Sequence, residues 1–236
     1  MELVLSAIAG AGTLVGAAAV ALLGRLDHRT LAAVLGVAAG VMGGVVAGDL
    51  LPAALGYAGP PAVLFSLTAG IAAVAWGDAR LRGILRRGWD PLLKTGLLVG
   101  TGIALHDLPE GLAIAAGFAA MPKLGFLMVT AIGLHNIPEG MATAAPLLAA
   151  GVKKRVVMAA CAALSAVTPL GTAAGLGLAR TSPFCIAALS AAAAGAMLYV
   201  VLAELVPRAV SHHFGAGTGG LLTGIALVYL LVRILP

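Results

Sequence analysis

The chain alternates long apolar runs with short polar or Pro/Gly breaks, and this pattern predicts membrane-spanning helices. About 20 apolar residues suffice to cross a bilayer as a helix. The runs are continuous, whereas the strands of a membrane barrel alternate apolar and polar positions. Eight helices are predicted, over residues 3–23, 31–51, 60–78, 92–117, 123–150, 155–179, 184–206 and 217–235.

Composition agrees with this pattern. Of the 236 residues, 61% are hydrophobic and 10% are charged, and the mean hydropathy is +1.09. Soluble domains carry about 25% charged residues, so the composition argues against a soluble enzyme. We expect an all-α integral membrane protein in which residues 1–236 form one polytopic transporter domain, with membrane lipid around it.

The basic residues predict an orientation. The net charge is +5, but Lys and Arg fall in the short gaps between apolar runs, so nucleic acid is not an expected partner. Eleven of them lie in one set of connections and three in the other. The richer set should face the cytoplasm, with both termini outside. The expected location is the plasma membrane, which is the inner membrane in a bacterium. Cys161 and Cys185 are expected to be packing residues.

Two similar polar motifs interrupt the apolar pattern. HDLPEG occupies residues 106–111 and HNIPEG occupies residues 135–140, and each lies well inside a predicted helix. At 1.5 Å rise per residue, both fall near the bilayer midplane on antiparallel neighbours. His and Glu stand four residues apart in each motif and therefore share one helix face. The candidate metal ligands are His106, Asp107, Glu110, His135, Asn136 and Glu139.

Electrostatics favours a bound cation among these groups. A charge at the centre of a membrane helix costs roughly 2.5–3.5 kcal/mol, so three carboxylates would cost on the order of 8–10 kcal/mol. Two imidazoles, three carboxylates and an amide suit zinc, iron(II) or manganese. The ligands outnumber the four of one tetrahedral zinc, which makes a two-metal site plausible. The alternative is a neutral hydrogen-bonded network with protonated carboxylates.

At these residues the sequence resembles the zinc–iron permease (ZIP) family of divalent-metal transporters. Its His-Asn/Asp-x-Pro-Glu-Gly pattern is met by both motifs. Further matches are GVMGGVVAGDLLP at 40–52, LSAVTPLGTAAG at 164–175 and GAMLYVVLAELVP at 195–207.

The resemblance implies a binuclear centre. One metal would bind His106, Glu110, His135 and Glu139 with Asn136 nearby, and the other Asp107 and the two bridging glutamates. It also implies eight helices, a homodimer and an elevator-like movement. In this movement, the four helices predicted at 3–23, 92–117, 123–150 and 155–179 would move against the other four predicted helices. Many relatives carry Glu before the proline where Thr168 precedes Pro169 here, which weakens the second position.

Two predicted helices share a spacing that suggests an inverted repeat. Asp49 lies nine residues after Gly40, and Glu204 lies nine residues after Gly195; Pro52 and Pro207 each follow three residues later. The predicted topology runs the two helices in opposite directions, as an inverted repeat of the first three and last three helices around the central pair would. Asp49 is a candidate entrance residue, and Glu204 and His212 are candidate exit residues. Helix capping or pairing with a loop Arg is the alternative.

Transport is the predicted function, namely movement of zinc, or iron(II), manganese, cobalt or cadmium, into the cytoplasm without a resident cofactor. The alternative is an intramembrane zinc-dependent hydrolase. A zinc protease usually shows H-E-x-x-H, whereas the spacing here is His-x-x-x-Glu, twice. A proton-coupled carrier of organic solutes would need a more extensive polar lining. We therefore expect no enzyme.

Overall fold

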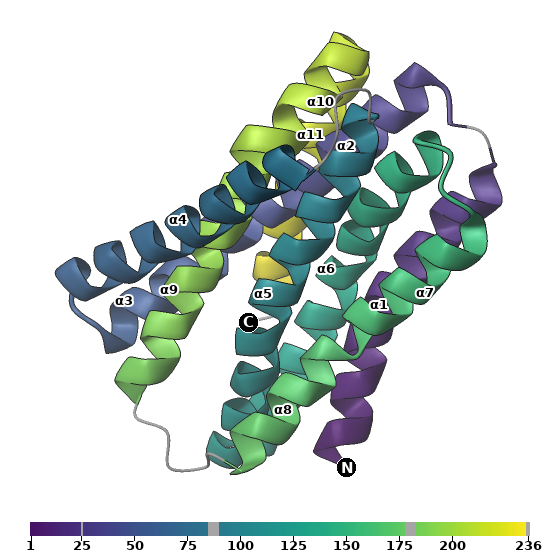
Figure 1. Cartoon of the computed structure of the whole chain (residues 1–236). Coiled ribbons are helices and arrows are strands. Elements are labelled where there is room, and N and C mark those ends of the chain that lie inside the picture. The colour runs from purple at the N-terminus through teal and green to yellow at the C-terminus, as the bar shows by residue number, and fades with distance from the viewer. Residues whose placement is uncertain (25, 85–89, 178–182, 235–236) are drawn as a thin grey trace.

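The chain folds into a bundle of helices (Figure 1). The structure is a computed structural model that describes residues 1–24, 26–84, 90–177 and 183–234. Every regular element in these ranges is helical. The elements are α1 Glu2–Leu23, α2 His28–Val45, η1 Val46–Leu50, α3 Leu51–Tyr57, α4 Pro60–Ile84, α5 Pro91–Ala120, α6 Pro122–Ala149, α7 Lys154–Ser165, α8 Val167–Gly177, α9 Pro183–Val200, η2 Val201–Leu205, α10 Val206–His212 and α11 Phe214–Ile234.

Helix length and hydropathy confirm a multi-pass membrane protein. Among the described residues, six helices are long and apolar enough to cross a bilayer: Glu2–Leu23, His28–Tyr57, Pro60–Arg80, Pro91–Ala119, Lys154–Gly177 and Ala187–His212. The C-terminal helix adds a shorter apolar stretch, Phe214–Leu230. The eight-span topology, the repeat and the outward termini stay predictions.

Two helices contain a π-helical segment at corresponding places. The five residues of η1 connect α2 to α3, and the five residues of η2 connect α9 to α10. Pro52 and Pro207 lie in the turn that follows each segment. Because a π segment already interrupts the regular i→i−4 hydrogen bonds, the missing N–H of the next proline does not end the helix. The predicted helix ends at 51 and 206 were therefore too early, and the helices continue to Tyr57 and His212.

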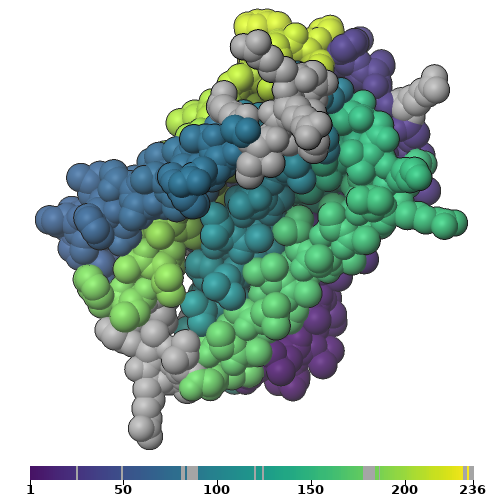
Figure 2. All heavy atoms as spheres, viewed as in Figure 1, coloured from purple at the N-terminus to yellow at the C-terminus, as the bar shows by residue number. Residues whose placement is uncertain are grey.

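The helices pack in two groups. In one, α1 lies against α6 and α7, and α5 lies against α6 and α8. In the other, α2 packs along α11, and α4 packs along α9 (Figure 1). Contacts between α5 and α9 and between α2 and α6 join the groups. In the space-filling view, the teal surface of α5 is visible between α9 and the green α7–α8 segment (Figure 2).

Glycines allow the closest helix approaches. A Cβ at Gly36 or Gly40 of α2 would overlap the backbone carbonyl of Gly217 or Leu221 on α11. On the other side of the bundle, a Cβ at Gly16 of α1 would overlap the carbonyl of Ile137 on α6. Small residues thus let helix backbones meet directly, as is common between membrane helices.

Candidate metal centre

The two motifs lie on the central antiparallel pair. HDLPEG is on α5 and HNIPEG is on α6, which packs against it. Both helices run without interruption through Pro109 and Pro138. The motif glycines connect this pair to its neighbours, because a Cβ at Gly111 would overlap Thr168 O of α8 and a Cβ at Gly140 would overlap Thr13 O of α1. Gly is therefore needed at the end of each motif.

Each histidine reaches the glutamate of the other helix. The Nε2 atom of His106 lies 3.0 Å from Glu139 Oε1. The Nε2 atom of His135 lies 2.9 Å from Glu110 Oε1. All four side chains are buried, the most exposed being His135 at 6%. The predicted ligands of the two helices thus meet in one cluster, and neither helix contains the complete set.

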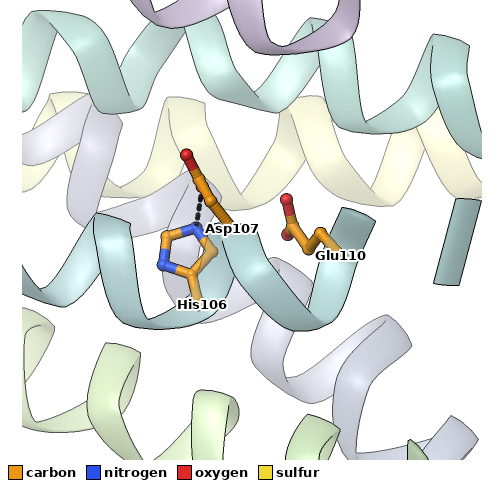
Figure 3. A group of neighbouring side chains, drawn as sticks. All are labelled: His106, Asp107 and Glu110. Carbon is orange, nitrogen blue, oxygen red and sulfur yellow. Dashed lines mark ion pairs between the residues drawn. The ribbon is translucent and has the colours of Figure 1, made fainter. Parts of the chain in front are cut away.

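The hydrogen bond of His106 determines which ring nitrogen is free. Its Nδ1 lies 3.2 Å from the backbone oxygen of Gly102, which can only accept a hydrogen bond, so Nδ1 carries a proton. In the neutral ring Nε2 then holds a lone pair. That lone pair faces Glu139, and it also faces Asp107 Oδ1 at 3.3 Å (Figure 3). Three acceptors that converge in this way need a proton or a metal ion between them.

Several oxygens in the cluster lack a partner. Asp107 and Glu110 project from α5 with His106, and the ligand atoms of these three residues lie within 4.8 Å of one another (Figure 3). Zinc ligands at about 2.0–2.2 Å must lie within about 4 Å of each other, so a small closure would complete this set. Within the described part of the chain, the buried oxygens without a hydrogen-bond partner include Asp107 Oδ2, Glu110 Oε2, Asn136 Oδ1, Glu139 Oε2 and Thr168 Oγ1.

The equivalent positions Asp107 and Asn136 differ in their surroundings. Asn136 donates through Nδ2 to the backbone oxygen of Ala9 on α1, at 3.1 Å. Its amide is therefore tied to α1, and only Oδ1 is left to act as a ligand. Asp107 keeps a fully buried carboxylate. Thr168 is fully buried on α8, and its backbone meets α5 at Gly111.

Two of the candidate pathway residues, Glu204 and His212, lie outside this cluster. Glu204 is 2% exposed and binds Lys94 Nζ at 2.7 Å through Oε1, while Thr95 Oγ1 donates to its Oε2 at 2.8 Å. Its carboxylate is thus held by two residues of α5, with Lys94 as the close partner and Arg208 Nε farther away at 3.9 Å. The exit role of Glu204 stays a prediction. His212 lies against His28, with their Nδ1 atoms 2.9 Å apart. The side chain of Asp49 lies outside the described residues.

The buried ion cluster around Lys94 was missed by the sequence reasoning. Lys94 Nζ also lies 3.0 Å from Asp78 Oδ1, and Tyr199 donates to Asp78 Oδ2 at 2.8 Å. Lys94 belongs to α5, whereas Asp78 is on α4 and Glu204 is in η2, so these contacts connect the two packing groups. The available signal was Asp78 at the end of the predicted range 60–78 and Lys94 near the start of the predicted range 92–117. The orientation argument counts Lys94 only as a charge of the connections. Of the two free cysteines, only Cys161 is buried; the packing role predicted for Cys185 does not fit its exposed position.

The fold and the site together define a class of protein. It is a multi-pass helical protein with a buried His/carboxylate cluster between two central helices. The ZIP Zinc transporter family model matches residues 92–232, which include both motifs. The chain is 34% identical over 250 residues to a zinc transporter ZupT of Escherichia fergusonii, with 98% of this chain and 97% of that protein covered. It is also 34% identical over 223 residues to zinc transporter ZupT of Shigella dysenteriae, with 89% and 86% covered.

The chain therefore belongs to the ZIP family of zinc transporters. This confirms the resemblance found in the motifs, and it confirms that the chain is a transporter and not an enzyme. The alternative of an intramembrane hydrolase is not favoured.

Proposed function

We propose that the chain carries divalent transition metal into the cytoplasm through the cluster between α5 and α6. Zinc is the first candidate, because the relatives from Escherichia fergusonii and Shigella dysenteriae are zinc transporters. Iron(II), manganese, cobalt and cadmium are further candidates, since His and carboxylate ligands discriminate weakly among these metals. The bacterial relatives support placement in the inner membrane.

The observation that carries this proposal is the set of acceptors around His106 Nε2. Two carboxylates approach a nitrogen whose partner, Nδ1, already holds a proton against Gly102 O. A purely structural network would pair its donors with its acceptors. An excess of buried acceptors is instead the chemistry of a cation site, and the transported metal would be that cation.

We further propose that the centre holds two metal ions. His106, Glu110, His135 and Glu139 would bind one, with Asn136 Oδ1 nearby. Asp107 would bind the other, and the two glutamates would bridge. Unequal affinities are expected, because Asn136 is tied to α1 and Thr168 contributes a hydroxyl where a carboxylate would bind more strongly.

The two packing groups support alternating access. The proposed moving group is α1 with α5, α6, α7 and α8, and the remaining helices would form the group that stays in place, with a homodimer as the proposed assembly. The site lies entirely within the moving group, so a bound metal could move together with its ligands. Asp49 remains the proposed entrance residue.

Metal uptake by liposomes that contain the purified protein tests the function. Zinc uptake should require the protein, and it should fall to the level of protein-free liposomes in Glu110→Gln and Glu139→Gln, which keep the shape of each side chain. Glu2→Gln on α1 is the matched control, because this carboxylate lies outside the cluster. Equal uptake by the wild type and both central variants would refute the proposal.

A further inference from the structure

Two histidines from distant parts of the chain meet at one end of the bundle. His28 begins α2 and His212 ends α10, and the two are 184 positions apart. Their Nδ1 atoms are 2.9 Å apart, while the ring centroids are 5.2 Å apart with 24° between the ring planes. The centroids are farther apart than the nitrogens, so the rings present their Nδ1 edges to each other. His28 is exposed and His212 is partly exposed, so a solute ion can reach both.

This pair lines a cavity between the two packing groups. The cavity has a volume of about 730 Å³. The histidines and Leu31 form the wall that belongs to α2 and α10. The other wall contains Leu92 of α5 and the connection from α6 to α7, between Leu148 and Lys154. This connection belongs to the Lys- and Arg-rich set that the sequence predicts to face the cytoplasm. The histidines therefore lie at the predicted cytoplasmic opening between the groups.

The geometry suits a shared cation. Two neutral imidazoles whose Nδ1 atoms face each other can share one proton, and a divalent ion can replace it. With metal–nitrogen bonds of about 2.0–2.1 Å, a nitrogen separation of 2.9 Å gives a nitrogen–metal–nitrogen angle of about 90°. Imidazole nitrogen is a good ligand for zinc, copper, iron and nickel.

The ligand set predicts weak binding. In the described residues, the one group of three or more His, Cys, Asp or Glu side chains arranged to hold a metal is that of His106, Asp107 and Glu110. The His28–His212 pair would therefore bind metal with water in the other positions. Weak coordination and access to solvent permit rapid exchange, which suits release and not storage.

We propose that His28 and His212 form a second, weaker transition-metal site that receives metal at the cytoplasmic opening of this cavity. The role in release rests on the transport function proposed above. The binding site itself does not, because it is defined by the two imidazoles and the cavity. Binding can therefore be measured independently of transport.

Zinc binding to the purified full-length protein in detergent tests the site. Asp107→Asn, Glu110→Gln and Glu139→Gln together remove the three central carboxylates, so weak zinc binding elsewhere can be measured by titration calorimetry. In this background we expect one weak zinc ion per chain. Adding His28→Gln or His212→Gln should raise its dissociation constant about tenfold or more, since even the loss of a ligand's supporting partner costs 10–100-fold.

His213→Gln is the matched control. His213 is adjacent in sequence and exposed, and its Nδ1 accepts a hydrogen bond from Ala216 N at 3.1 Å, outside the pair. Unchanged binding in both pair variants, or an equal loss in His213→Gln, would overturn the proposal. Loss in only one of the two pair variants would also overturn it. Failure of the transport proposal would appear separately, as zinc uptake that does not depend on Glu110 and Glu139.

Discussion

His106 of α5 and Glu139 of α6 are joined across two helices, with His106 Nε2 3.0 Å from Glu139 Oε1. His135 and Glu110 repeat this relationship in the opposite direction at 2.9 Å. The His and Glu of one motif share a helix face, yet each pairs with the residue of the other motif. The proposed metal-binding unit is therefore the pair of helices, and separating α5 from α6 would divide every proposed ligand set.

Zinc should stabilise the folded protein through this unit. A ligand present at 100 times its dissociation constant adds about 2.7 kcal/mol to the free energy of unfolding. We expect zinc to raise the thermal unfolding midpoint of the wild type in detergent, and Glu139→Gln to abolish most of that increase. Glu2→Gln should respond like the wild type. A zinc-induced increase that is equal in all three proteins would place the bound metal elsewhere.

Asn136→Asp should destabilise the protein when no metal is present. The Asn136 amide donates to Ala9 O at 3.1 Å, and a carboxylate would set two acceptors against each other at this buried position. Leaving a buried polar group unsatisfied costs about 1–3 kcal/mol. Chelator-treated protein should therefore unfold at a lower temperature than the wild type. Asp107→Asn is the reciprocal control, and it should not be destabilised, because it removes one of the clustered carboxylates.

Gly140→Ala should separate α1 from α6. The new methyl group would overlap Thr13 O, and overpacking of this kind costs about 1–3 kcal/mol. The thermal unfolding midpoint should fall, and zinc uptake should fall with it because α6 carries half of the site. Gly43→Ala is the control, since a Cβ there meets nothing within 4 Å among the described residues. A loss of stability in Gly43→Ala as large as in Gly140→Ala would exclude this explanation.

Lys94 should couple energetically to Glu204. Lys94→Met would leave the 2%-exposed Glu204 without its 2.7 Å partner, and removing one member of a buried pair costs about 3–5 kcal/mol. Glu204→Gln in the same chain should recover part of this loss. A double-mutant cycle of unfolding free energies measures the coupling. Lys123→Met, at an exposed position, should have little effect, and additive losses in the cycle would contradict the pairing.

The sequence was most informative where one chemical requirement dominated. Continuous apolar runs predicted the helices, because a backbone inside lipid must satisfy its own hydrogen bonds. The duplicated motif predicted which polar side chains would gather, because buried carboxylates need a partner. Both arguments depend on composition and spacing alone, which the chain displays directly.

The rest depends on contacts between residues far apart in sequence. Lys94 binds Glu204 although the two residues are 110 positions apart in sequence. The residues around Glu204 in the sequence do not indicate this contact. The pairing of His28 with His212 requires the start of α2 to meet the end of α10. This contact follows from how α2, α10 and α11 pack. The helix extensions past Pro52 and Pro207 depend on π segments, which hydrophobic periodicity does not distinguish from α-helix.

Cross-pairing also has a consequence for biogenesis. During synthesis α5 emerges first, so His106, Asp107 and Glu110 reach the insertion machinery before their partners on α6 exist. Only Met121 separates the end of α5 from the start of α6. Entry of the two helices as one hairpin would let each motif shield the charges of the other from lipid. The order of translation and the shortness of this turn thus make α5 and α6 a natural unit of membrane insertion.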